Sequence, residues 1–214
     1  MRATSYLLAF AAVTLTLILN IVSSKRVDWL VVRYKENAIR TKVTFFYGLA
    51  ERCQETISQI PTPSGDGKFT YRSYECRPFP QQDYDQCDGD SFCTAWRAAY
   101  YIDQVAIGFA ALALAGILIG ATTHSRRRRV WRSVVGLVLV AALCQIAVFA
   151  IITDVFEEAP FPALDTARPA LGYIFHFLAW LLNILITLGI LVAGVSADAG
   201  HAWALGDRGY EPIA

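Results

Sequence analysis

Four long apolar blocks constrain the fold of this chain more than any other feature. They are Tyr6–Val22, Ile102–Thr122, Val134–Thr153 and Leu171–Val195. Each is nearly free of charge and close to the ~20 apolar residues that a helix needs to cross the hydrocarbon core of a bilayer. Lipid offers no hydrogen-bond partner to a backbone amide, so each block is expected to be helical. The sequence therefore predicts a membrane protein with four spans, in agreement with a mean hydropathy of +0.40.

The four blocks organise residues 1–214 as one domain. We expect the spans to cover residues 6–24, 96–122, 134–153 and 170–195. The segments between and after them are residues 25–95, 123–133, 154–169 and 196–214. The first block has a second interpretation, as the apolar region of a cleaved signal peptide with Ser23 and Ser24 near the cleavage site.

The distribution of charge indicates the side on which each loop lies. The link between the second and third blocks holds five arginines and no acidic residue: Arg126, Arg127, Arg128, Arg129 and Arg132. Short cationic loops lie on the cytoplasmic side of membrane proteins. We therefore expect both termini in the cytoplasm and residues 25–95 outside. The arginines are also expected to contact anionic lipid headgroups, at about 1 kcal/mol per basic residue, and not nucleic acid.

Four of the five cysteines lie in the expected outer loop: Cys53, Cys76, Cys87 and Cys93. Four cysteines in an exported loop indicate two disulfides, for which three pairings exist. We favour Cys53–Cys76 together with Cys87–Cys93. The alternative is a set of free thiols in a reducing compartment. Metal binding is not expected, because the loop has neither a CxxC pair nor a histidine.

The outer loop also carries the signals of β-strands. Segments rich in β-branched and aromatic residues are Val27–Tyr34, Thr41–Tyr47 and Lys68–Tyr74, and a run of Pro and Gly at residues 61–67 lies between the last two. They predict a small antiparallel sheet of three or four strands. A sheet of this size buries little apolar surface, so we expect the disulfides to stabilise it.

Few ionisable side chains lie within the spans. Asp103 is interpreted either as an ion or proton ligand or, by preference, as a partner of Arg97 or Arg33. His176 lies one or two turns into the fourth span, where a buried and bonded histidine is favoured over a pH sensor. Transporters and intramembrane enzymes need ionisable groups inside the bundle. With only Asp103, Asp154 and His176 available, we expect no catalytic residue, no bound metal and no cofactor.

Small residues mark two candidate packing faces in the spans. Gly116 and Gly120 form a GxxxG pattern, which allows helices to approach closely. We expect this pattern to pack within the bundle rather than to form a dimer. Gly189 and Ala193 form a small-residue face on the fourth span, which is a candidate docking surface for another membrane protein.

The exported loop contains the run YGLAERC at residues 47–53. With its surroundings it resembles the pattern of the claudin and peripheral-myelin-protein superfamily: a Trp in the first outer strand, then Gly-Leu-Trp-x-x-Cys, a second Cys, and an Arg before the second span. The matching positions are Trp29, Gly48, Leu49, Cys53, Cys76 and Arg97. Ala50 stands in place of the signature Trp, and the gap between Cys53 and Cys76 is longer than in claudins. The motifs CRPFP, FCTAWR, THSRRRR and GHAWALGDRGYEPI are similar to those of claudin-like tetraspans of filamentous fungi.

The resemblance implies an all-α membrane four-helix bundle that carries a small, disulfide-stapled antiparallel β-sheet in its first outer loop. It further implies that Trp29, Gly48 and Leu49 seat the sheet on the membrane surface, and it offers no catalytic residues. We therefore expect a non-enzymatic protein that organises a membrane domain or mediates self-association or adhesion at the cell surface. The plasma membrane is the expected location, and the endoplasmic reticulum is the alternative. The alternative function is that of an accessory subunit of a channel, transporter or membrane-bound synthase.

Overall fold

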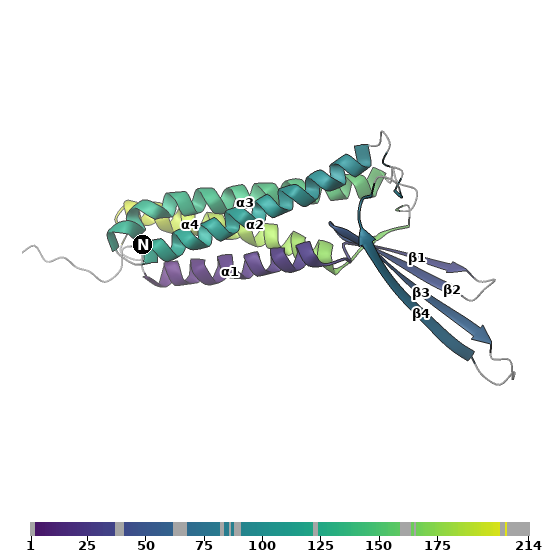
Figure 1. Ribbon diagram of the computed structural model, residues 1–214. Coiled ribbons are helices and arrows are strands. Elements are labelled where there is room, and N and C mark those ends of the chain that lie inside the picture. Colours follow the sequence, from purple (N-terminus) through teal and green to yellow (C-terminus); the bar gives the residue numbers. More distant parts are fainter. Residues whose placement is uncertain are drawn as a thin grey trace, which may run out of the picture. The chain divides into compact units, whose positions relative to one another are not determined.

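A computed structural model gives the structure of the chain (Figure 1). It describes residues 3–36, 41–61, 68–81, 84–85, 87, 91–121, 124–158, 164, 166–201 and 204. Four of its helices are long and apolar enough to cross a membrane. The chain is therefore a multi-pass membrane protein, as the four apolar blocks predict.

The helices extend beyond the apolar blocks. They are α1 (Ala3–Lys25), α2 (Ser91–Ala121), α3 (His124–Glu158) and α4 (Leu171–Asp198). Because α3 begins at His124, the backbone of the predicted basic loop is helical for most of its length. Arginine is a good helix former, so the run of arginines continues the helix instead of ending it.

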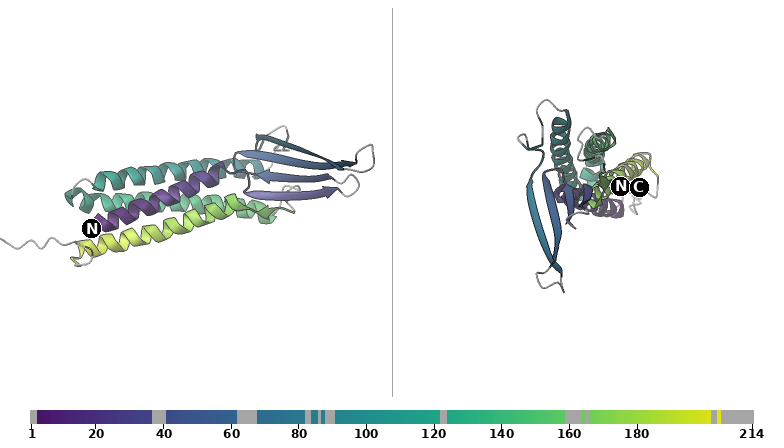
Figure 2. Two further views of the ribbon diagram at one scale, coloured as in Figure 1. Left: turned by 90° about the horizontal axis from the view of Figure 1, so that it is seen from below. Right: turned by 90° about the vertical axis from the view of Figure 1, so that its right-hand side faces the viewer.

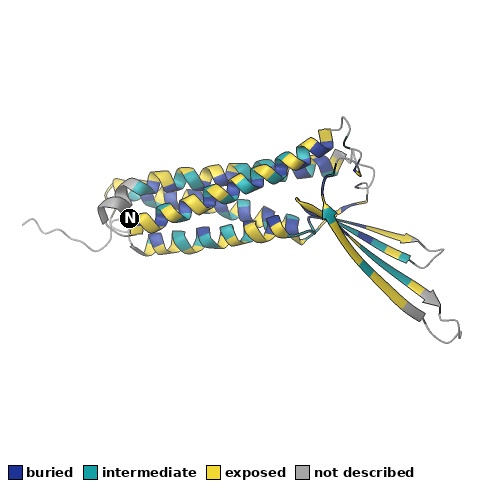
Figure 3. Cartoon of the chain, in the orientation of Figure 1, coloured by how far each residue is buried: buried dark blue, intermediate teal, exposed yellow. Residues whose placement is uncertain are grey.

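Cα packing divides the chain into two compact units. The helical unit comprises Met1–Asn20, Gln104–Ile146 and Leu178–Ala214, and its helix segments lie side by side (Figure 2). Its buried core includes Tyr6, Val13, Ile117, Trp131 and Ile190. Exposed positions recur along the helices (Figure 3). Many of the large side chains at such positions are Leu, Ile and Val. These side chains suit lipid, because lipid tails are as apolar as they are.

The sheet unit comprises Ile21–Asp103 and Ala147–Phe177. Its strands are β1 (Leu30–Glu36), β2 (Thr41–Tyr47), β3 (Glu51–Pro61), β4 (Lys68–Pro78) and β5 (Arg168–Pro169). They form one antiparallel sheet in the order β4-β3-β2-β1-β5. Trp29, Leu30, Tyr47, Leu49 and Trp96 belong to the core of this unit.

The structure confirms the predicted antiparallel sheet, but the sheet has more strands than the sequence predicted. The bounds of β2 match the prediction, whereas β4 continues beyond Tyr74 to Pro78. The sequence did not predict β3, and the sheet has five strands instead of three or four. The fifth strand, β5, comes from the segment before α4 and pairs with Leu30 and Val31 of β1.

Candidate functional site at the seat of the sheet

Five residues of the sheet unit join the sheet to the helix ends. We call them the sheet seat: Trp29, Gly48, Leu49, Trp96 and Gly172. They come from four separate stretches of the sequence, and Trp29, Leu49 and Trp96 are almost completely buried. Three of the residues that resemble the claudin signature are among them.

Trp29, which follows α1, is the centre of the seat. Its indole Nε1 donates a hydrogen bond of 2.8 Å to the carbonyl oxygen of Ser23. Its backbone N–H donates to the carbonyl oxygen of Tyr47 at 3.0 Å, and its own carbonyl accepts from the N–H of Ala170 at 2.9 Å. A Cβ atom on Gly172, in the first turn of α4, would lie 2.6 Å from Cδ1 of the indole. Trp29 therefore connects the end of α1, strand β2 and the start of α4.

Gly48 and Leu49 form the turn between β2 and β3. A Cβ atom on Gly48 would lie 2.7 Å from the carbonyl oxygen of Arg26 and 2.8 Å from Cα of Val27, and both are backbone atoms. Only glycine fits this position without a backbone shift. The carbonyl oxygens of Gly48 and Leu49 each accept a hydrogen bond of 3.2 Å from Nε1 of Trp96 on α2. The turn is thereby tied to a second helix.

Trp96 is a seat residue that the sequence did not reveal. A tryptophan near the end of a span is common, because its ring suits the membrane interface. In the structure it is fully buried, and its ring packs edge-on against Phe79 with centroids 5.2 Å apart. Ala50, which replaces the signature Trp, is exposed.

Arg97 matches the signature but lies outside the seat. Its guanidinium donates to the carbonyl oxygen of Pro80 at 3.3 Å. This bond joins α2 to the segment after β4. The structure therefore gathers Trp29, Gly48 and Leu49 at one place and leaves Arg97 at another.

Both favoured disulfides are confirmed. Cys53 and Cys76 lie opposite each other in β3 and β4, with Cα atoms 4.0 Å apart. The second disulfide joins Cys87 to Cys93 in the first turn of α2. Cys144, on α3, is a free thiol.

A buried carboxylate beside β4 forms a second unpredicted cluster. Both side-chain nitrogens of the Arg77 guanidinium fork bind Asp85, one of them at 2.7 Å. The N–H of Gln81 donates to the same carboxylate at 2.7 Å, and Nη1 of Arg52 lies 3.5 Å from it. Burial favours the neutral form of Asp85, but the bonds from Arg77 and Gln81 and the two positive charges outweigh it and lower its pKa. The side-chain bond to Asp85 raises the pKa of Arg77.

Asp103 does not meet the expected arginines. Arg33 is exposed and Arg97 binds Pro80, so the favoured interpretation of Asp103 is wrong. Its carboxylate is instead completely buried, with Oδ1 3.6 Å from Nδ1 of His176 on α4. The His176 ring is also fully buried and packs on the ring of Trp29, with centroids 4.9 Å apart. The two ionisable residues that the sequence placed on different spans thus lie together under the sheet seat.

Within the helical unit, two buried amide side chains form a hydrogen bond, and two glycines allow neighbouring helices to approach closely. Nδ2 of Asn183 donates to Oε1 of Gln145 at 2.8 Å. A Cβ atom would meet Val134 at 3.2 Å if placed on Gly116, and Tyr6 at 2.8 Å if placed on Gly120. The GxxxG face therefore packs within the helical unit, as predicted.

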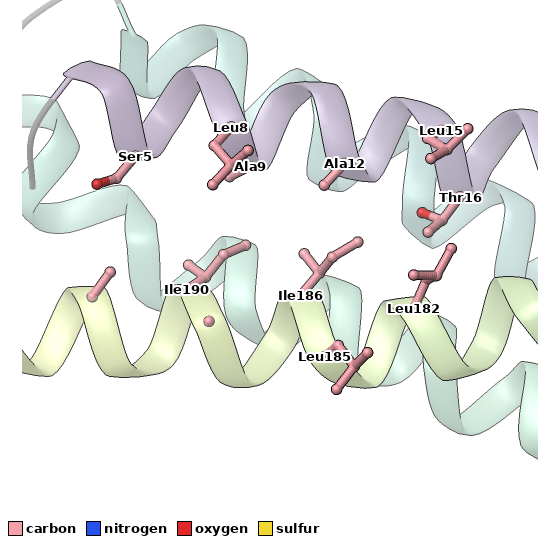
Figure 4. A pocket seen from close by; sticks show the side chains of 12 residues that line it. Ser5, Leu8, Ala9, Ala12, Leu15, Thr16, Leu182, Leu185, Ile186 and Ile190 are labelled. Carbon is pink, nitrogen blue, oxygen red and sulfur yellow. The ribbon is translucent and has the colours of Figure 1, made fainter.

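A groove of about 480 Å³ lies between α1 and α4 in the helical unit (Figure 4). Its walls are almost entirely apolar, and Ser5 and Thr16 are its polar residues. Gly189 and Ala193, the candidate docking face, line it, and the position of a Cβ atom on Gly189 is open space. The groove therefore leaves room for a side chain or acyl chain from outside.

Of the five arginines in the basic run, Arg132 is the one whose side chain the structure describes. The side chains of Arg126, Arg127, Arg128 and Arg129 lie outside the described residues. Arg132 is exposed and forms an ion pair of 3.2 Å with Asp198 of α4. Within the described residues, no three His, Cys, Asp or Glu side chains converge to hold a metal ion.

Comparisons with known proteins do not assign the chain to a family. No family model matches the sequence. No curated protein matches it either.

Proposed function

We propose that this protein is a non-enzymatic, claudin-like tetraspan that self-associates through its sheet and thereby organises a membrane domain at the cell surface. We place the sheet outside the cell, the basic run and both termini in the cytoplasm, and the protein in the plasma membrane. The two disulfides support an oxidising surrounding for the sheet. The acidic link before α4 and the arginines before Val134 support the placement of the sheet outside and of the basic run in the cytoplasm.

The observation that carries this proposal is the free edge of β4. The strand pairs with β3 on one side along all eleven of its residues, and it is the last strand of the sheet on the other. An unpaired strand edge offers a row of N–H and C=O groups to another chain. Tyr71 and Tyr74 on this strand are 55% and 54% exposed, and tyrosine is enriched in protein interfaces.

The side chains of β4 also suit pairing with a second copy. In a two-fold, antiparallel pair centred on Ser73, Arg72 lies opposite Tyr74 of the other copy. Tyr71 then lies opposite Glu75, so no two like charges face each other. Cross-strand pairs of this kind stabilise sheets, whereas like charges directly opposite destabilise them. We therefore take a second copy of this chain as the partner of the β4 edge.

Cross-linking in intact cells, followed by purification of a tagged protein in mild detergent, tests this function. A ladder of the protein cross-linked to itself is expected. A single different membrane protein in fixed stoichiometry, without such a ladder, would contradict self-association. That result would establish the accessory-subunit function in its place.

The groove between α1 and α4 favours the accessory function as the second candidate. Small residues let a helix from another protein approach closely, and Gly189 and Ala193 face this open space. If a partner helix lies there, Gly189→Leu should abolish co-purification of that partner. Gly136→Leu is the matched control, because Gly136 lies outside the groove and also has open space at its Cβ position. Equal recovery of the partner with both variants would exclude the groove as its binding site.

A further inference from the structure

A hollow of about 340 Å³ lies where the end of α1 meets one face of the sheet, and we call it the α1 pocket. All of its lining residues belong to the sheet unit. They are Lys25 to Asp28 at the end of the span, Phe46 of β2, Glu55 of β3, and Arg72 and Tyr74 of β4. The proposed function assigns no role to this pocket.

Four of the five charged side chains of the α1 pocket form ion pairs with each other. The Arg26 guanidinium binds the two carboxylate oxygens of Asp28, at 2.6 and 2.7 Å. Arg72 forms the second ion pair, with Glu55. The fifth charge, Lys25, is exposed and has no ion-pair partner among the described residues. With three basic and two acidic side chains, the pocket carries a net charge of +1.

Arg26 is held in place and still has hydrogen-bond donors to offer. Its contact with Asp28 uses Nε and Nη2, and its guanidinium lies over the ring of Phe175, 5.7 Å from the centroid. Within the part of the chain that the structure describes, Nη1 forms no hydrogen bond. An arginine side chain has five N–H donors, so those of Nη1 remain for a ligand. The pocket thus offers a fixed guanidinium edge together with the Lys25 ammonium.

The α1 pocket lies at the surface of the bilayer. Helix α1 is long and apolar enough to cross the membrane, and it ends at Lys25. The headgroup layer extends about 5–7 Å beyond each face of the hydrocarbon core. Lys25 and Arg26, which end the span, therefore lie at the depth of lipid phosphates. This depth is the same whichever side of the membrane the sheet occupies.

We propose that the α1 pocket binds the headgroup of a phospholipid that carries one negative charge. A phosphodiester without an ammonium group, as in phosphatidylglycerol, neutralises the net charge of the pocket. Its phosphate oxygens accept hydrogen bonds from Lys25 and from Nη1 of Arg26, and such charge-assisted bonds are strong. The rings of Phe46 and Tyr74 pack beside the uncharged remainder of the headgroup. Phosphatidylcholine brings a cation of its own and leaves the pocket with its excess charge, so it binds less tightly.

Photocross-linking of the full chain in nanodiscs tests the lipid site. The probe is phosphatidylglycerol with a photoreactive headgroup, diluted into phosphatidylcholine. Because the basic run at residues 126–132 is also expected to attract anionic lipid, the cross-linked peptides must be mapped. Cross-links are expected at residues 25–28, 46 and 72–74. A wild-type map with no cross-link at these positions would overturn the proposal, even if no variant folds.

Variants of Lys25 test the charge that the lipid recognises. Lys25→Gln should weaken the apparent affinity of the probe for the pocket about fivefold, the effect of one basic residue at a membrane surface. Lys25→Arg should preserve the affinity. Lys42→Gln is the matched control, because it removes the same charge from an exposed lysine of β2 outside the pocket. Equal affinity of Lys25→Gln and Lys42→Gln would refute the site.

Inorganic phosphate distinguishes a lipid from a soluble anion, which would offer the same chemistry. At millimolar concentration it should leave the cross-links in the pocket unchanged, because it lacks the acyl chains that hold a lipid at the surface. Loss of these cross-links in inorganic phosphate, with those at residues 126–132 retained, would assign the pocket to a soluble anion. That result would overturn the lipid proposal.

Discussion

The first turn of α4 approaches Trp29 so closely that a Cβ atom on Gly172 would lie 2.6 Å from Cδ1 of the indole. This contact couples a residue that follows the first span to the beginning of the fourth. The indole is fully buried and hydrogen-bonded to Ser23, so it cannot turn away from an added methyl group. The contact between the sheet and the first turn of α4 therefore depends on the absence of a side chain at Gly172.

Substitution of the two seat glycines should destabilise the protein. Gly172→Ala crowds the Trp29 ring, and Gly48→Ala crowds the carbonyl oxygen of Arg26. Overpacking of this kind costs about 1–3 kcal/mol in the free energy of unfolding. Unfolding of purified variants in detergent would measure the loss. Gly136→Ala is the control with open space, and equal stability of Gly172→Ala and Gly136→Ala would contradict the crowded seat.

The two disulfides should contribute unequally to stability. Cys53 and Cys76 are 23 residues apart and Cys87 and Cys93 are 6 apart, so the first closes the longer loop of the unfolded chain. On the chain-entropy account, the first contributes about 3 kcal/mol and the second less. The paired serine variants of each disulfide, compared by chemical denaturation, would measure the difference. A larger loss from the Cys87–Cys93 variant would show that the difference in loop length does not determine their contributions.

The sequence predicts these features unevenly, and the reasons are physical. The spans and the cysteine pairs follow from apolar length and from the position of cysteines in one loop. Strand β3 was missed because most of its residues are polar, as in Glu51, Gln54 and Glu55. It is a strand because it pairs with β2 on one side and β4 on the other. Pairing between strands cannot be predicted from the residue pattern of one segment alone.

The seat and the buried clusters were harder still to predict. Nothing in the sequence distinguishes Asp85 from the acidic residues around it, because its partner Arg77 is fixed only by the fold. Trp96 resembles an ordinary interfacial tryptophan. Asp103 and His176 were each noticed as polar residues in a span, but only tertiary packing places them together.

Acid should weaken the protein through Asp85. Its pKa is lowered in the folded state, so it contributes stability above the unfolded value of about 3.9, and this contribution is lost as the pH falls below that value. Asp85→Asn should lower the free energy of unfolding at pH 7 by about 1.5–3 kcal/mol, the range for a hydrogen bond to a charged group. It should also remove this acid dependence.

The matched control for Asp85 is the ion pair between Arg72 and Glu55. The Arg72 side chain is 70% exposed, so Arg72→Gln should change the stability by less than about 1 kcal/mol. Thermal unfolding of the three proteins between pH 3 and 7 would compare them. A similar loss from both variants would show that the burial of Asp85 has no special effect.

Glycosylation should reveal the side of the membrane on which the sheet lies. The wild-type sequence has no Asn-x-Ser/Thr site, and Lys68→Asn would create one with Thr70 at the start of β4. Because we place the sheet outside, this variant should gain a glycan that shifts its mobility on a gel and is removed by a glycosidase. Adding Thr70→Ala should abolish the shift. If Lys68→Asn stays unmodified while a reporter glycoprotein in the same cells is glycosylated, the proposed orientation is wrong.

The most direct test of self-association is disulfide trapping along β4 in the membrane. Directly opposed residues of an antiparallel pair have Cα atoms about 4.5–5.5 Å apart, which is within reach of a disulfide. Ser73→Cys, at the two-fold centre, should give a reducible dimer, whereas Tyr71→Cys and Glu75→Cys should give much less, because each lies opposite the other position and not opposite itself. Ser58→Cys on the interior strand β3 should give none, since both of its edges are occupied. If no position on β4 cross-links more than this control, the β4 edge does not join two copies and the central proposal fails.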